Sequence, residues 1–164
     1  MGLEMDSGGF LANLHTGEQL MLTPRNMLSR AWALAEPLLK KTWDEGWEDK
    51  YSLETLYDRL AKGECQLWMV NDKDKFFYCL ITELLVFEFK TVCYLGYFGV
   101  EKWEDAERVM PFITIVEDWA RDIQVDRIVV QGRRAFSKKL RPLGYYEKQV
   151  VLWKDISPVK EGNA

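Results

Sequence analysis

Residues 126–156 read DRIVVQGRRAFSKKLRPLGYYEKQVVLWKDI, and this stretch decides the fold. The apolar run RIVV at 127–130 predicts a short buried strand. The residues after it have helical spacing over 134–143, and Gly144 is placed to end that helix, since glycine reaches left-handed backbone angles at little cost. The apolar residues within 147–156 predict a last strand. This part of the chain is therefore predicted to form a strand, a helix and a strand.

Two helices are predicted in the first third of the chain. The first covers 22–47, with Thr23 as its N-cap, and Pro37 predicts a kink or a break because proline removes an interior hydrogen bond. The second covers 51–64, with Ser52 as its N-cap. Both carry apolar residues on one face, as helices packed against other elements do.

Three strands are predicted after these helices, at 65–70, 76–89 and 91–100. The middle run is too long for one flat strand, so a bulge or a strong twist is expected. Helical spacing returns over 104–123, between two strands. Consecutive strands indicate antiparallel pairing, and a strand–helix–strand unit indicates a parallel step. The predicted fold class is α/β, with a mixed, mostly antiparallel sheet and helices on both faces.

The composition fits one globular domain. The chain has 164 residues, of which 48% are hydrophobic and 29% charged, and its net charge is -4. No apolar run reaches the ~18 residues that span a bilayer. The N-terminus has no basic segment followed by an apolar one, so no secretory leader is predicted. We expect an arm or short lead-in strand at 1–20, one domain at 21–156 and a tail at 157–164.

The cysteines and the single histidine argue against a metal site. Cys65, Cys79 and Cys93 are far apart and form no C-x-x-C pair, and His15 lies in a polar N-terminal stretch. Zinc sites and Ser-His-Asp triads need positioned thiolate or imidazole groups. The sequence therefore predicts no metal, and it predicts reduced, mostly buried thiols in a cytoplasmic protein.

The order of these elements resembles that of the GNAT N-acetyltransferase superfamily. Many members end with a strand, a short helix, the letters GF or GY, and a final strand, which here are RIVV, AFSKKLRPLGYY and VVLWKDI. The segment LTPRNMLSRAWALAEPLL is similar to the superfamily's first strand-to-helix passage, so the resemblance covers 20–156. Within the superfamily the chain looks most like the small GNAT-like proteins of tailed phages and prophages. Those proteins often carry the letters GR after the fifth strand, which here are Gly132 and Arg133.

The resemblance implies an N-acetyltransferase that uses acetyl-CoA. In this superfamily the fourth strand parts from the fifth, and its backbone pairs with the pantetheine arm of the coenzyme like an added strand. The segment LGYFGV would then hold the arm, through Gly96, Tyr97, Phe98, Gly99 and Val100. A simple bulged strand is the alternative interpretation of the two glycines.

Two motifs of the superfamily are altered in this chain. Its pyrophosphate loop reads Gln/Arg-x-x-Gly-x-Gly/Ala, whereas 99–110 reads GVEKWEDAERVM, with no glycine after Gly99. The acidic side chains of this segment compete with an anion for the donors of a helix start. Many active members protonate the coenzyme thiolate with a Tyr at the position of Leu140, so Tyr145 or Tyr146 is left as the candidate acid.

A basic stretch precedes Gly144, although the sequence pI is about 5.2. It consists of Arg133, Arg134, Lys138, Lys139 and Arg141. Three interpretations stay open. The cations form the solvated face of an amphipathic helix, or Arg133 and Arg134 bind the phosphates of the coenzyme, or the stretch binds nucleic acid, which an acidic chain disfavours.

Glu83 and Glu88 interrupt the apolar sequence of 76–89. An acetyltransferase needs a base that takes a proton from an ammonium group before the attack, and a partly buried carboxylate suits this task. Glu83 is the better candidate because its neighbours are more uniformly apolar. The alternative is a carboxylate on the solvent face of a half-exposed strand.

Two functions agree with these residues. The first is an N-acetyltransferase that takes acetyl-CoA and an amine, with Glu83 as the base. The second is a catalytically silent interaction protein, either a virion component or a modulator of a host protein, in the host cytoplasm or the virion. Fold alone does not decide between them. The sequence specifies neither the acceptor amine nor the oligomeric state.

Overall fold

The structure is a computed structural model that describes residues 11–14, 16–43, 51–131, 134–150, 152, 154, 156 and 157. The chain falls into two compact units, Met1–Gln131 and Gly132–Ala164, and each is described by itself. The first unit contains the sheet and the helices that pack on it, and the second contains a short helix. The limits of 1–20, 21–156 and 157–164 for arm, domain and tail stay predictions.

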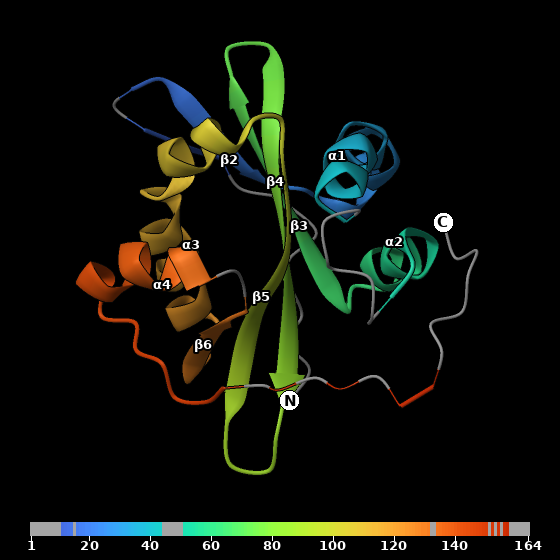
Figure 1. Ribbon diagram of the computed structural model, residues 1–164. Helices are drawn as coiled ribbons and strands as arrows, with labels where there is room; N and C mark the ends of the chain where they lie inside the picture. Colours follow the sequence, from blue (N-terminus) through green and yellow to red (C-terminus); the bar gives the residue numbers. More distant parts are fainter. Residues whose placement is uncertain are drawn as a thin grey trace. The chain divides into compact units, whose positions relative to one another are not determined.

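The first unit is built on a six-stranded sheet whose strands lie in chain order (Figure 1). They are β1 (Leu11–Asn13), β2 (Glu18–Leu22), β3 (Cys65–Asp72), β4 (Lys75–Val86), β5 (Thr91–Val100) and β6 (Arg127–Val130). Neighbouring strands are antiparallel except β5 and β6, which are parallel. A parallel pair needs a crossover, and the helical segment between β5 and β6 supplies it.

Helices cover both faces of this sheet (Figure 1). The helices α1 (Leu28–Trp43) and α2 (Leu53–Ala61) form one core cluster with buried residues of β3, β4 and β5. The helix α3 (Phe112–Asp122) and the 3₁₀ helix η2 (Trp103–Val109) form a second cluster with β2, β3 and β4. The predicted α/β class with a mixed sheet is therefore confirmed. In the part of the chain that the structure describes, no helix is long and apolar enough to cross a membrane.

The two predicted N-caps had different outcomes. Ser52 caps α2, because its Oγ accepts a backbone N–H of the first turn at 3.1 Å. The prediction for Thr23 is wrong: its N–H donates to the Leu67 carbonyl at 2.9 Å, so Thr23 prolongs the pairing of β2 with β3. A 3₁₀ turn, η1 (Arg25–Met27), then leads into α1. The helix α1 runs through Pro37 without ending there.

A β-bulge lies in the middle of the β4–β5 pair. Ile81 is opposite Tyr97, and Thr82 is opposite Leu95, which leaves Gly96 as the extra residue of β5. A second register shift lies in the β3–β4 pair, near the start of β4. The irregularity expected in the long 76–89 run is therefore present. A bulge re-aims the side chains that follow it, and this bulge shapes the site described below.

The second unit contains α4 (Arg134–Leu140) and the 3₁₀ turn η3 (Arg141–Leu143). Gly144 follows with a φ of 92°, which confirms the predicted helix stop. The prediction of a strand over 147–156 is wrong for its described residues, which belong to no strand. Val150, Leu152 and Ile156 are between 78% and 89% exposed. Apolar residues with strand-like character do not make a strand without a hydrogen-bonded neighbour.

Candidate functional site

The strands β5 and β6 pair over only part of the length of β5. Val92 to Leu95 pair with Arg127 to Val130, and the last hydrogen bond runs from the Gln131 N–H to the Leu95 carbonyl at 3.4 Å. Within the described part of the first unit, no strand pairs with residues 97–100 on the side away from β4. On that side this stretch of β5 has no paired strand among those of the first unit, and an extended ligand can add to such a sheet edge as a further strand.

Glu83 of β4 is 3% exposed and lies on the strand next to β5. Its cross-strand neighbours are Cys65 of β3 and Tyr94 of β5. Cross-strand partners share a face of the sheet, and here it is the face that α1 and α2 cover. The alternative of a carboxylate on a solvent face is therefore wrong for Glu83. Glu88, in contrast, is exposed in the turn between β4 and β5.

Arg59 of α2 holds the Glu83 carboxylate. Its Nη2 lies 2.5 Å from Glu83 Oε1, and its Nη1 lies 3.5 Å from Glu64 Oε2. The guanidinium also stacks over the Tyr51 ring, with its central carbon 4.7 Å from the ring centroid. A charge-assisted pair of this kind fixes the direction of the carboxylate, because Arg donors have a rigid planar geometry. The helix α2 is thereby tied to the sheet at the base of the candidate site.

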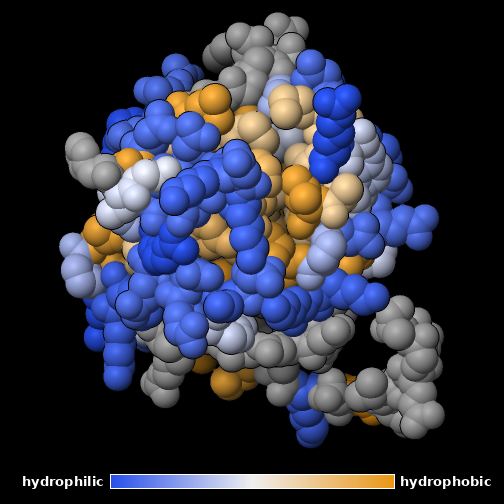
Figure 2. All heavy atoms as spheres, turned by 90° about the horizontal axis from the view of Figure 1, so that it is seen from above, coloured by the Kyte–Doolittle hydropathy of each residue, from blue (hydrophilic) through white to orange (hydrophobic). Residues whose placement is uncertain are grey.

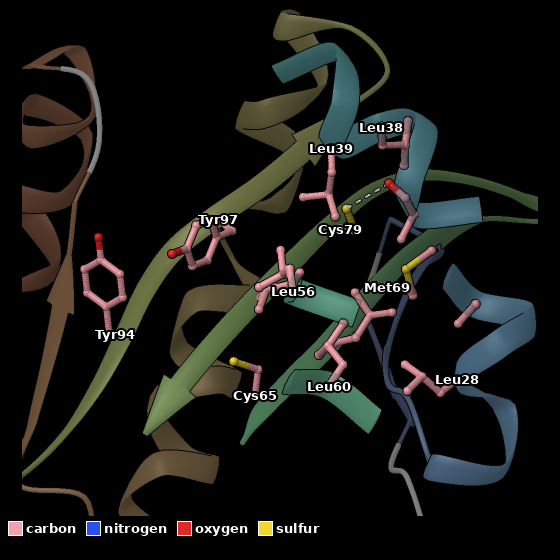
Figure 3. Packing of buried hydrophobic residues seen from close by; sticks show 14 residues of the cluster. Leu28, Leu38, Leu39, Leu56, Leu60, Cys65, Met69, Cys79, Tyr94 and Tyr97 are labelled. Carbon is pink, nitrogen blue, oxygen red and sulfur yellow. Dashed lines mark hydrogen bonds between the residues drawn. The ribbon is translucent and has the colours of Figure 1, made fainter. Parts of the chain in front are cut away.

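Two tyrosines of β5 lie near Glu83. Tyr94 and Tyr97 both come from β5, with their ring centroids 6.4 Å apart and nearly perpendicular (Figure 3). They are three residues apart, and residues at that spacing face opposite sides of a regular strand. The bulge at Gly96 shifts the pleat by one residue, so that both rings join the core under α1 and α2. Gly96 is therefore needed to bring the two rings together.

The Tyr94 hydroxyl donates to Oε1 of Gln131, directly after the end of β6. This bond crosses from β5 to the point where the two strands part. Burial raises the pKa of Tyr94 and of Tyr97, and the negative charge of Glu83 adds to both shifts. Both hydroxyls therefore stay protonated through neutral pH and can act as hydrogen-bond donors.

Cys65 is a further ionisable group beside Glu83. It is buried, and burial raises the pKa of its thiol above the ordinary value of 9.0. A neutral thiol is a poor nucleophile, so the geometry does not favour a Cys65 acyl-enzyme. Among the described residues there is no group of three or more metal-binding side chains. The polar groups that this cluster brings together are a carboxylate, a guanidinium and tyrosine hydroxyls.

The segment after β5 differs from a phosphate-binding loop. Residues 103–109 form the 3₁₀ helix η2, with Glu104 and Asp105 in its first turn. Its one arginine, Arg108, lies 2.6 Å from Asp72 Oδ2 and 3.0 Å from Glu18 Oε1. Arg108 also lies 3.2 Å from Asp105 Oδ1, so three carboxylates surround it. Its guanidinium is therefore engaged by the protein and is not offered to an anion.

Gly99 serves the packing of α1. A Cβ built there would lie 2.5 Å from the carbonyl carbon of Leu38 and 2.6 Å from the nitrogen of Leu39. The backbone that comes close to Gly99 is thus that of α1. Figure 3 shows the two leucines beside β5. Gly99, which the resemblance assigns to coenzyme binding, is therefore explained by the close packing of α1 on β5.

The structure brings only part of the predicted site together. Glu83 lies across from β5, which carries Gly96, Tyr97, Phe98, Gly99 and Val100. Arg133 lies outside the described residues, and of Arg134 the structure describes its place as the first residue of α4. Tyr145 follows Gly144 in the second unit, where its N–H donates to the Leu140 carbonyl at 3.3 Å. The roles proposed for these three residues stay predictions.

Sequence reasoning missed four residues of the cluster: Arg59, Tyr51, Tyr94 and Gln131. One signal for Arg59 was available, because a carboxylate in an apolar strand needs a cation, and Arg59 lies next to the apolar stripe of its helix. Tyr94 has no such signal, since the face that it shares with Tyr97 depends on the bulge.

No protein-family model matches this sequence, and no curated protein sequence matches it at a significant level. Solved structures match it in fold. An aminoglycoside acetyltransferase from an uncultured soil metagenomic sample, in complex with trehalose, is 15% identical to this chain and superposes with a TM-score of 0.66. The match covers 86% of this chain and 97% of that one. The chain has an acetyltransferase fold.

Two further solved structures of acetyltransferases, one of them named a GNAT family acetyltransferase, share this fold. A GNAT family acetyltransferase from Staphylococcus aureus is 11% identical, with a TM-score of 0.57 over 85% of this chain and 99% of its own. A predicted acetyltransferase with acetyl-CoA from Clostridium acetobutylicum is 9% identical, with a TM-score of 0.60 over 84% of this chain and 96% of its own. At these identities the likeness shows the GNAT acetyltransferase fold, and the activity is a separate question.

Proposed function

We propose that this chain is an acyltransferase that moves an acyl group from a pantetheine thioester, such as acetyl-CoA, to an amine. The observation that carries the proposal is the open edge of β5 at residues 97–100, with the buried Glu83 carboxylate on the neighbouring strand. An arm added to this edge would run along β5. Its thioester end would then lie near the Gly96 bulge, next to Glu83 and the two tyrosines.

Each residue of the cluster has a role in this proposal. The backbone of residues 97–100 holds the arm, and Glu83 accepts the proton that the attacking ammonium group loses. Arg59 keeps the Glu83 carboxylate in one direction. In the net reaction a carbon–sulfur bond of the donor is exchanged for a carbon–nitrogen bond of the product. The thiolate that leaves takes up one proton, and Tyr145 stays the candidate donor of that proton.

The residues fit only one half of acetyl-CoA. The open edge suits the pantetheine arm, which presents amide groups along its length. The segment after Val100 does not suit the nucleotide half, because it has no glycines and carries acidic residues in the first turn of η2. No step of the proposed reaction is assigned to the nucleotide half.

The missing phosphate loop is also the observation that favours a second function. A protein that kept the fold but lost coenzyme binding would act through its surface, as a virion component or a modulator of a host protein. The resemblance to phage and prophage proteins stays a prediction, and it agrees with either function. It predicts that no thioester binds.

A binding and rate experiment separates the two functions. Acetyl-CoA is titrated by calorimetry while the melting temperature is followed, and a ligand at a hundred times its Kd adds about 2.7 kcal/mol of stability. The enzyme proposal predicts binding, and the Glu83→Gln variant keeps the affinity but loses at least about 100-fold in rate. Glu88→Gln, in the exposed turn, keeps both. If acetyl-CoA, S-acetylpantetheine and an acetylated holo-carrier protein all fail to bind, the enzyme proposal is wrong and the second function is favoured.

A further inference from the structure

The end of β5 decides which part of a donor can be recognised. An arm whose thioester lies beside Glu83 runs along residues 97–100 toward Val100. Whatever follows the arm must then lie at residues 101–108, the lead into η2 and η2 itself. This end of the sheet lies at the top of Figure 1, and Figure 2 shows it from above as mostly hydrophilic residues around a hydrophobic area.

The charges in this place are predominantly negative. Glu101 directly follows β5, and Glu104 and Asp105 stand in the first turn of η2. Lys102 follows Glu101 in the chain, and among the described residues of the first unit Lys41 Nζ donates to the Glu101 carbonyl at 2.8 Å. Both lysines are exposed, and exposed ammonium groups contribute little to a site.

Arg108, the arginine of η2, is already neutralised. Its three carboxylate partners, Glu18, Asp72 and Asp105, outnumber it, and Glu18 is 5% exposed. Freeing Arg108 for a phosphate would leave the buried Glu18 without its guanidinium, which is costly for a buried charge. A nucleotide diphosphate brings two negative charges to a place that already has an excess of them.

We infer that the acyl donor of this protein is a pantetheine thioester whose arm is not followed by a nucleotide diphosphate. The inference rests on the proposed function and names its donor class. Such a donor is either a small free thioester or an acylated phosphopantetheine arm attached to a carrier protein. Both place neutral amides on β5, and neither places a diphosphate against η2.

Calorimetry with three donors tests the inference. The donors are S-acetylpantetheine, acetyl-CoA and an acetylated holo-carrier protein, each at low and at high salt. We expect the Kd of S-acetylpantetheine to lie within about 3-fold of that of acetyl-CoA, or below it. We also expect acetyl-CoA to bind more tightly at high salt, because salt screens the repulsion at η2. If the acetylated carrier protein binds more tightly than S-acetylpantetheine, the carrier protein is the source of the donor. If the two bind equally, the free thioester is the donor.

Charge variants make the test specific. The double variant Glu101→Gln with Glu104→Gln should strengthen acetyl-CoA binding several-fold and leave the Kd of S-acetylpantetheine unchanged. Glu88→Gln, at the other end of β5, should change neither. If acetyl-CoA binds at least about 30-fold more tightly than S-acetylpantetheine, and salt weakens that binding, the inference is overturned while the proposed function stands. If none of the three donors binds, the proposed function itself is overturned.

Discussion

The Nη2 atom of Arg59 on α2 lies 2.5 Å from Oε1 of Glu83 on β4, and Glu83 is almost fully buried. This pair joins a helix to the middle of the sheet beside the place where β5 and β6 part. It accounts for a charged residue in an otherwise apolar strand. It also gives the candidate base one fixed direction, which a catalytic carboxylate needs.

Replacing Arg59 by Met should destabilise the protein by about 3 kcal/mol, because the partner carboxylate is left buried without its cation. Chemical denaturation measures the loss. Arg121→Met is the matched control: Arg121 pairs with Asp118 at 2.6 Å, but both side chains are more than 70% exposed. Exposed pairs contribute less than about 1 kcal/mol. Equal losses in the two variants would show that the Arg59–Glu83 pair has no special role.

Replacing Gly99 by Ala should cost at least about 2 kcal/mol, because the new methyl group meets the backbone of α1 at 2.5 Å. The clash is with backbone atoms, so α1 itself must shift. Gly17→Ala is the comparison, since its Cβ meets nothing within 4 Å and only its φ of 101° is unfavourable. We expect about 1 kcal/mol there. The packing role of Gly99 is refuted by a loss no greater than that of Gly17→Ala.

The stability of the fold should fall as the pH rises above 9. Burial raises the pKa of Cys79 and of Cys93 from 9.0 to about 12. The unfolded chain therefore loses these protons first, so the stability they contribute is complete below pH 9 and is lost as the pH rises toward 12. We expect the melting temperature to fall by more than about 5 °C over this range.

The double variant Cys79→Ala with Cys93→Ala identifies the groups responsible. Its loss of stability between pH 9 and about pH 10 should be smaller than that of the parent, because it lacks two buried thiols that the unfolded chain deprotonates in this range. Above that range buried Tyr78, whose pKa burial also raises, continues the loss in both proteins. Parallel stability curves for parent and variant below pH 10 would contradict the assignment to the thiols.

Much of the fold could be predicted because its signals are local. The Ser52 cap, the Gly144 stop and the apolar runs of β3, β4 and β5 depend on nearby residues, and the structure confirms them. The failures depend on distant partners. Thr23 has the composition of a cap, but Leu67 offers its N–H a place in the sheet. The described part of 147–156 has the apolar residues of a strand without forming one.

The candidate site was predictable only in part, for the same reason. Glu83 could be singled out because a charge in an apolar strand is unusual at the level of sequence. Its partner Arg59 is 24 residues earlier in the chain, and only the packing of α2 on the sheet brings them together. The shared face of Tyr94 and Tyr97 depends on the Gly96 bulge, whose position is set by the register of β4.

Backbone amide hydrogen exchange along β5 tests the central claim, that the open edge beside Glu83 holds a pantetheine thioester. We predict that amides of residues 97–100 that point away from β4 exchange quickly in the free protein and at least about 10-fold more slowly with saturating S-acetylpantetheine. Amides of Val92 to Leu95, already in the paired part of the sheet, should not change. Unchanged exchange at 97–100 in the presence of bound thioester, or protection at those amides before any ligand is added, would contradict the account.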